Sequence, residues 1–228
     1  RLITMSGNTP AGRAIVAICR RLYDRGYLVA TEGNVSVRLP SGDILVTGTR
    51  VRKREITARD LVRITPGGAR VAGASRPSSE AAMHRFIYSK RRDVHAIVHA
   101  HPPYCTAFAL AGRPLPVDAI PEARVEFGEV PLVPYAAPST GKLTKALAPY
   151  VGKANFFLLA NHGVVACAPD LGEAYDLVER AEHAARILLL SGFLGGAKNL
   201  TAARLRELDA IRMKRMKVSK HGGINKKG

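Results

Sequence analysis

The sequence predicts an α/β fold in which helices cover both sides of a largely antiparallel sheet. Residues 34–47 and 61–72 each place alternating apolar residues on either side of a turn rich in Pro and Gly, a pattern typical of β-hairpins. Apolar residues at helical spacing recur before, between and after the short apolar runs. Hairpins join neighbouring antiparallel strands, so the sheet is not expected to be wholly parallel.

The first half of the chain is predicted to run from a helix through the two hairpins to a second helix and a strand. Residues 10–23 have the apolar spacing of a helix, and Gly26 is expected to end it. Residues 78–80, Ser-Ser-Glu, are predicted to open a helix that reaches about residue 90, because Ser is a preferred N-cap. The apolar run 94–101 then predicts a short buried strand.

The second half alternates the same two kinds of element. Helices are predicted near residues 103–108, 139–150, 170–192 and 201–213, and strands near 130–135, 155–160 and 164–167. No linker or low-complexity stretch divides the chain, so residues 1–228 are predicted to form a single domain. From about residue 212 to residue 228 every charged residue is basic, and this stretch is predicted to be a solvated, partly disordered tail.

The net charge of the chain indicates that its partners are anionic. The chain has 35 Lys and Arg against 18 Asp and Glu, a formal charge of +17 that attracts phosphorylated substrates, nucleic acids and acidic surfaces alike. A nucleic-acid binder is disfavoured, because the basic residues show no interleaved aromatics and no known reading motif. There is no membrane-length apolar segment and no signal-peptide pattern, and three scattered cysteines suit a reducing compartment. A cytoplasmic protein without membrane contact is therefore expected.

The strongest chemical signal is the end of the strand near residue 100. His99 and His101 are two residues apart, so their side chains point to the same side of the strand and can converge on one metal ion. The segment Asn161-His162-Gly163 directly follows another apolar run, and His162 is the candidate third ligand. Three His ligands leave the fourth tetrahedral position open, as in catalytic zinc sites. His95 shares their parity but lies about 13 Å upstream of His99 at strand rise, too far to bind the same ion.

The histidines, and the Ser-Ser-Glu segment at residues 78–80, also have purely structural interpretations. Two histidines at a strand end often face only a solvated edge. Ser78 and Ser79 could hold a phosphate at the helix N-terminus, or they could simply cap the helix. Glu80 in a first helical turn is expected in any case, because it favours the helix dipole.

Five short motifs in order and spacing resemble the class II aldolase/adducin family. The resemblance covers about residues 11–190, and its motifs are Gly33-Asn34-Val35-Ser36, Thr47-Gly48-Thr49, Pro77-Ser78-Ser79-Glu80, His99-x-His101 and Asn161-His162-Gly163. It implies a three-layer αβα fold around a mainly antiparallel sheet. It also implies a homotetramer with active sites at the subunit interfaces.

The resemblance assigns roles to eight residues. One Zn²⁺ per subunit is held by His99, His101 and His162, and Glu80 is the catalytic acid/base. The substrate phosphate is bound by Asn34, Thr49, Ser78 and Ser79. The implied activity is that of a zinc-dependent class II aldehyde-lyase. Such an enzyme reversibly cleaves a phosphorylated ketose, such as L-fuculose 1-phosphate, to dihydroxyacetone phosphate and an aldehyde through a metal-stabilised enediolate.

The sequence departs from the family's aldolases at three places. Arg50 stands where those aldolases have a glycine of the phosphate loop. Ile120 occupies the place of one acceptor-site tyrosine, and no tyrosine follows Tyr175 to supply the other. Tyr104 and Glu122 are the candidates to replace them.

Other activities within and beyond the family stay open. Dehydratase and decarboxylase members share a Glu at the position of Glu80, whereas the 4-epimerases resemble one another in having Asp there. An adducin-like binding module would lack a working metal site, which the three histidines and Glu80 argue against. Metal content of the purified protein separates an enzyme from such a module.

Overall fold

The structure of this protein, a computed structural model, describes residues 8–222. The strands are β1 (Asn34–Arg38), β2 (Ile44–Thr47), β3 (Leu61–Ile64), β4 (Arg70–Ala72), β5 (Ala96–Ala100), β6 (Leu132–Val133), β7 (Phe156–Leu159) and β8 (Gly163–Ala168). The helices are α1 (Pro10–Asp24), α2 (Ala81–Lys90), α3 (Pro103–Leu110), α4 (Pro121–Phe127), α5 (Gly141–Leu147), α6 (Leu171–Gly192) and α7 (Ala202–Gly222), with short 3₁₀ turns η1 (Ala58–Asp60) and η2 (Val117–Ala119).

The strands form one sheet in the order β4-β3-β2-β1-β5-β8-β7-β6. All neighbours pair antiparallel except β6 and β7, which are parallel, so the predicted mainly antiparallel sheet is confirmed. Both predicted hairpins are present, as β1–β2 and β3–β4. In the centre of the sheet, β5 lies between β1 and β8, which places Asn34 and Val165 on either side of His99.

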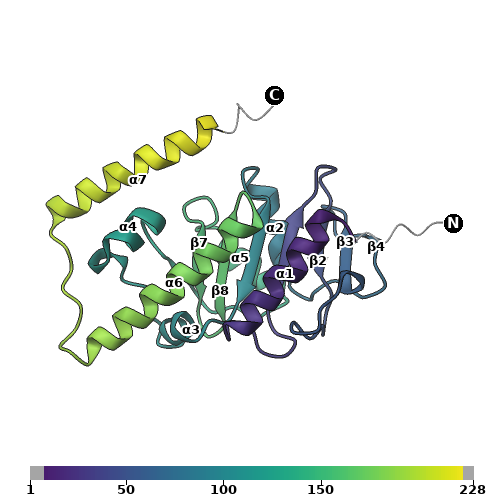
Figure 1. Cartoon of the computed structure of the whole chain (residues 1–228), viewed down its shortest axis with the longest axis horizontal. Helices are drawn as coiled ribbons and strands as arrows, with labels where there is room; N and C mark the ends of the chain where they lie inside the picture. The colour runs from purple at the N-terminus through teal and green to yellow at the C-terminus, as the bar shows by residue number, and fades with distance from the viewer. Residues whose placement is uncertain (1–7, 223–228) are drawn as a thin grey trace.

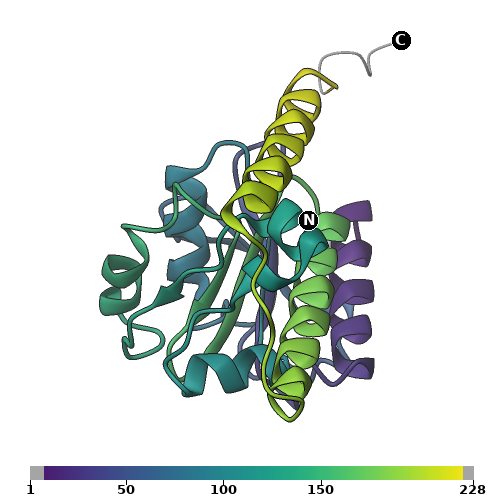
Figure 2. The same cartoon turned by 90° about the vertical axis from the view of Figure 1, so that its left-hand side faces the viewer.

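Helices cover both faces of the sheet and complete the predicted αβα arrangement (Figure 1, Figure 2). On one face, α1, α3, α4 and α6 pack with Val98 and Ala100 of β5 into one apolar cluster. On the other, α2 and α5 pack with Ile97 of β5 into a second cluster. Successive residues of β5 therefore contribute to opposite cores, and His99 shares the α2 face with Ile97.

Residues at the helix ends define where α1 and α6 begin and where α1 stops. The Thr9 hydroxyl accepts a hydrogen bond from the Gly12 N–H at the start of α1, and Asp170 accepts one from Glu173 at the start of α6. Just after α1, Gly26 has a φ of 72°, the left-handed conformation predicted for a helix stop. Helix α4, which has only seven residues, was not predicted from the sequence.

Helix α2 begins later than predicted. It starts at Ala81, so Glu80 is the N-cap residue, and the prediction that Ser78 opens the helix is wrong. Pro77 forms a β-bridge with Gly48, and the Ser78 N–H donates to the Thr47 carbonyl. These contacts hold residues 77–78 beside the end of β2 and the loop that follows it.

The last helix, α7, lies apart from the sheet and contacts α4 (Figure 1). Arg124 of α4 forms a two-pronged ion pair with Asp209, with distances of 2.7 and 2.8 Å. The basic segment predicted from about residue 212 continues this helix as far as Gly222, and residues 223–228 lie outside the described residues. Within residues 8–222, no helix combines the length and the apolar character needed to span a bilayer.

Gly33 packs against the strand that carries His99, so we expect a side chain at this position to destabilise the fold. Its φ is 65°, and a Cβ there would lie 2.7 Å from the His99 carbonyl oxygen and 2.3 Å from Leu28. Gly33→Ala should lower the free energy of unfolding by about 2–5 kcal/mol, from backbone strain plus overpacking. Urea denaturation measures the change.

Gly42 provides the matched control. Its φ is 87°, but a Cβ there would meet no atom within 4 Å, so Gly42→Ala should cost only about 1 kcal/mol of strain. Equal losses in the two variants would show that the close approach of Gly33 to β5 is unimportant for stability.

Candidate metal centre and active site

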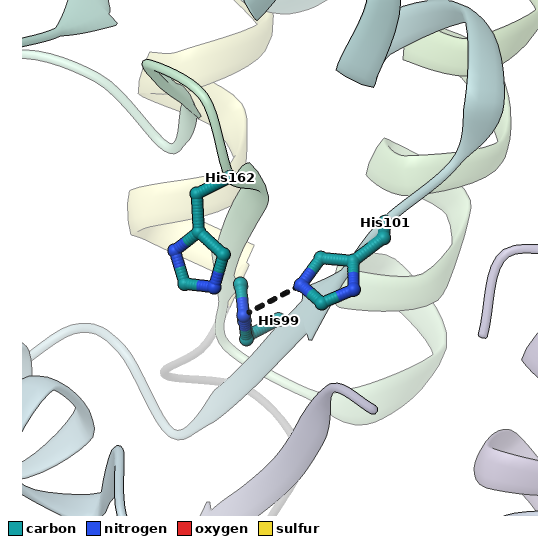
Figure 3. A group of neighbouring side chains, drawn as sticks. All are labelled: His99, His101 and His162. Atoms are coloured by element: carbon teal, nitrogen blue, oxygen red, sulfur yellow. Dashed lines mark hydrogen bonds between the residues drawn. The ribbon is translucent and has the colours of Figure 1, made fainter. Parts of the chain in front are cut away.

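His99 lies in β5, His101 directly follows the strand, and their side chains turn to the same side, as predicted. Their Nε2 atoms are 3.2 Å apart (Figure 3). His99 is fully buried, whereas the His101 side chain is partly exposed. By contrast His95 is exposed.

His162 joins this pair from the turn between β7 and β8. Asn161 adopts a φ of 58°, and β8 then pairs with β5, so the turn lies directly above the end of the histidine strand. The His162 ring centroid is 4.6 Å from that of His99 and 5.2 Å from that of His101. A Cβ on Gly163 would come within 2.4 Å of the His101 ring, so the residue after His162 has to be small.

The three rings form a donor set that fits one metal ion. Their ligand atoms lie within 4.8 Å of one another, and Figure 3 shows the imidazoles facing a common point. Two nitrogens bound to one tetrahedral Zn²⁺ would be separated by about 3.3 Å, close to the 3.2 Å between His99 and His101. We call His99, His101 and His162 the histidine cluster.

The outer ring nitrogens of two of these residues have protein partners. His99 Nδ1 donates to the Val164 carbonyl at 2.8 Å, and His101 Nδ1 donates to Glu32 Oε2 at 2.8 Å. With its single proton on Nδ1, a neutral imidazole presents the Nε2 lone pair to the centre of the cluster, as a metal ligand must. In the structure, His99 Nε2 instead faces Glu80 Oε2 at 3.1 Å. Glu32 was not predicted from the sequence, because no motif or periodicity connects it with a histidine 69 positions away.

Glu80 lies directly beside the histidine cluster. Its Oε2 is 3.1 Å from His99 Nε2 and accepts a hydrogen bond from Asn34 Nδ2 at 2.8 Å, while its Oε1 is 3.5 Å from His162 Nε2. Burial raises the pKa of this carboxyl, but the charge and hydrogen bond of His99, the charge of His162 and the Asn34 hydrogen bond outweigh burial. The net effect holds the pKa well below its usual range, so Glu80 is a carboxylate.

The histidines themselves differ in charge. Burial lowers the pKa of His162 to about 4, with the His99 charge acting in the same direction, and the same two causes lower the pKa of His101. Burial also acts to lower the pKa of His99, but Glu80 outweighs it and the net pKa is raised. Near neutral pH His101 and His162 are thus uncharged imidazoles, the form that binds metal.

The four residues assigned to phosphate binding gather around the start of α2. Thr49 follows β2, and its N–H donates to the Arg76 carbonyl, which joins its loop to the loop that carries Ser78 and Ser79. The Ser78 hydroxyl accepts from the Glu80 N–H at 3.3 Å. Asn34 approaches from β1 and is buried, and within the described residues its Oδ1 has no hydrogen-bond partner. A polar ligand that donates to this oxygen would satisfy it.

Arg50 extends this surface with a cation. It has a φ of 57°, a left-handed conformation that favours glycine, so the loop keeps the shape of a glycine loop although the residue is arginine. Arg50 and Arg76 are both exposed beside Thr49.

Tyr104 and Glu122, the candidates to replace the missing tyrosines, lie outside the histidine cluster. Tyr104 packs against the apolar cluster on the α1 and α6 face, and its N–H donates to Glu182 at 2.9 Å. It also lines a pocket of about 440 Å³ with Tyr27 and His183. Glu122 is exposed on α4. Among the described residues, no hydrogen bond, ion pair or ring contact joins either residue to the histidine cluster.

Comparisons with known proteins show what this chain is similar to. Residues 13–189 match the family model described as the class II aldolase and adducin N-terminal domain. A 3-oxo-tetronate 4-phosphate decarboxylase of Pectobacterium atrosepticum is 32% identical over 193 residues, covering 83% of this chain and 88% of the relative. An L-fuculose phosphate aldolase of Escherichia coli is 33% identical over 177 residues, covering 78% and 81%. A solved L-fuculose 1-phosphate aldolase superposes with a TM-score of 0.85 at 28% identity, covering 93% and 99%.

The histidine cluster leads to a metal-binding prediction. His99→Ala, His101→Ala and His162→Ala should each abolish tight zinc binding, because each removes one of three converging nitrogens. The exposed His95 supplies the control, since His95→Ala should leave zinc at about one ion per chain. Elemental analysis of the purified variants measures the content. Zinc retained by the His162 variant would mean that the third ligand lies elsewhere.

Proposed function

The chain belongs to the class II aldolase and adducin family, and on this premise we propose that it is a metal-dependent carbon–carbon lyase. Its substrate is a phosphorylated sugar or sugar acid. The observation that carries the proposal is the Glu80 carboxylate, buried against the Nε2 atoms of His99 and His162. The decarboxylase and the aldolase named above support it, since both names describe lyases that act on phosphorylated compounds.

In this proposal His99, His101 and His162 hold one Zn²⁺ per subunit. Three imidazole nitrogens with a further position available are typical of catalytic zinc. Bound there, the ion supplies a Lewis acid that polarises a substrate carbonyl. A homotetramer with active sites between subunits and a cytoplasmic location stay predictions from the sequence.

Asn34, Thr49, Ser78 and Ser79 bind the substrate phosphate at the N-terminus of α2. Backbone N–H groups and the helix dipole favour an anion at such a terminus. Arg50 and Arg76 add positive charge at its rim. The Asn34 amide also donates to Glu80, so a phosphate bound at Asn34 would lie next to this carboxylate, which itself borders the histidine cluster. This arrangement brings the carbons of a short sugar phosphate to Glu80.

Aldol cleavage of a ketose phosphate requires two proton transfers. A base removes the proton of the hydroxyl β to the carbonyl, the bond between the α and β carbons breaks, and its electron pair moves toward the carbonyl oxygen. The aldehyde leaves, and an acid then protonates the α carbon. Glu80 performs the transfer at carbon, and a second group has to accept the hydroxyl proton.

Decarboxylation of a 3-oxo acid phosphate requires a proton transfer only at carbon. The bond to the carboxylate breaks, carbon dioxide leaves, and the electron pair moves toward the 3-oxo oxygen before the carbon is protonated. Within residues 8–222, Glu80 and Glu32 are the carboxylates against the histidine cluster, and Glu32 is held by the outer nitrogen of His101. A single described chain thus contains the groups for decarboxylation, whereas aldol cleavage needs a second acid/base, which a neighbouring subunit would supply.

Product analysis tests the proposal and separates the two reactions. The purified zinc protein is incubated with L-fuculose 1-phosphate, with dihydroxyacetone phosphate as the readout, and with 3-oxo-tetronate 4-phosphate, with carbon dioxide as the readout. One substrate should turn over, and its unphosphorylated counterpart should react far more slowly, because it lacks the group that the α2 terminus binds. Equal rates with and without phosphate would contradict the assigned phosphate site.

Glu80→Gln tests the acid/base assignment. Glutamine keeps the size and the hydrogen bond with Asn34 but cannot exchange a proton, so turnover should fall by roughly 10²–10⁴-fold. Zinc content and substrate affinity should change little. Steady-state kinetics on zinc-loaded protein provide the measurement. Near-normal turnover at full zinc occupancy would exclude Glu80 as the proton-transfer residue.

A further inference from the structure

We propose that Glu32 is a positioning residue of the metal centre, which holds His101 in the orientation and tautomer that a metal ligand requires. This inference rests on the proposed function, because it takes the histidine cluster as a metal site. It adds a residue outside the motifs that identify the family site. Glu32 lies in the turn before β1, immediately ahead of Gly33 and Asn34.

The hydrogen-bond chemistry of this pair fixes the tautomer. Glu32 Oε2 is 2.8 Å from His101 Nδ1, and a carboxylate can only accept there. A neutral imidazole has one N–H, so placing it on Nδ1 leaves the lone pair on Nε2. That Nε2 lies 3.2 Å from His99 Nε2, on the inner side of the cluster (Figure 3). Without an acceptor at Nδ1, the proton is free to move to Nε2 and block the ligand atom.

The segment that carries Glu32 contacts His101 at two points. The carbonyl of Tyr27 accepts from the His101 N–H at 2.9 Å, and Glu32 accepts from its ring. Residues 27–32 thus contact both the backbone and the side chain of this one histidine. A ligand held at both ends loses little freedom when it binds a metal.

Lys53 holds the backbone of residues 27–32 through hydrogen bonds. Lys53 is only 1% exposed, and its Nζ donates to the carbonyls of Thr31 and Val51, each at 3.0 Å. The Lys53 N–H donates to the Ala30 carbonyl. On the other side of Glu32, Gly33 packs against the His99 carbonyl. The backbone of Glu32 is therefore held on both sides, although its side chain is 55% exposed.

The three histidines are supported in different ways. A main-chain carbonyl supports His99, and the Glu32 carboxylate supports His101. His162 Nδ1 is buried and has no hydrogen-bond partner among the described residues. Of these supports, the one at His101 can be removed by a single side-chain substitution. Because Glu32 is half exposed and outside both apolar clusters, its removal should affect the metal more than the fold.

Zinc affinity in three variants tests the proposal. Competition with a chromogenic chelator measures the zinc dissociation constant of the full-length protein. Glu32→Ala should weaken zinc binding by about 10–100-fold, the usual effect of removing a hydrogen-bond partner of a metal-bound histidine. Glu32→Gln keeps an acceptor oxygen and should restore most of the affinity. Glu129→Ala removes one exposed carboxylate elsewhere and should bind zinc like the unmodified protein.

The imidazole tautomer provides a second readout that needs no metal. In metal-free protein labelled at histidine, long-range ¹H–¹⁵N correlation should show His101 protonated at Nδ1, and Glu32→Ala should remove that preference. His101→Gln identifies the signal. The proposal is overturned if Glu32→Ala binds zinc as tightly as Glu129→Ala, if Glu32→Gln is as weak as Glu32→Ala, or if the tautomer does not change. Failure of the unmodified protein to bind zinc would instead count against the proposed function, and the tautomer would still decide the role of Glu32.

Discussion

The position of β5 between β1 and β8 is the constraint on which the site depends. Antiparallel pairing sets Asn34 opposite His99 on one side and Val165 opposite it on the other. The turn before β8 then brings His162 to the end of β5, and the start of β1 brings Asn34 to Glu80. Since side chains alternate along a strand, a one-residue slip in either pairing would turn these groups toward the opposite core. The strand register that stabilises the sheet therefore also assembles the donor set.

Burial and close contacts together determine which of Glu80 and the three histidines are charged. Glu80 is almost fully buried, yet His99 and Asn34 keep it ionised, while burial keeps His101 and His162 uncharged. A buried carboxylate needs compensating charge, because desolvation penalises an unpaired ion. A divalent cation at the histidine cluster would supply that charge, so the chemistry of the donor set and the electrostatics of Glu80 point to the same ligand. The exposed arginines beside Thr49 extend the positive potential toward an incoming phosphate.

Short-range sequence patterns predicted much of this structure. The features that were not predicted depend on contacts between residues far apart in the sequence. Strand periodicity was sufficient to place His99 and His101 on one side, and turn composition was sufficient for both hairpins. The start of α2 was misplaced because the bridge between Pro77 and Gly48 overrides the capping preference of Ser78. Glu32 was missed because its role comes from a tertiary contact with His101 rather than from a local pattern. The proximity of Glu80 to the histidines followed from the family resemblance, and the structure adds its contact with Asn34.

The central claim is that three imidazole Nε2 atoms converge on one metal ion. X-ray absorption spectroscopy at the zinc edge of the purified protein tests this most directly, because it reports the type, number and distance of the ligands. Three nitrogen ligands at about 2.0–2.1 Å with the scattering pattern of histidine rings are expected, with an oxygen ligand in the remaining position. A sulfur shell at about 2.3 Å, or fewer than three imidazoles, would contradict the central claim.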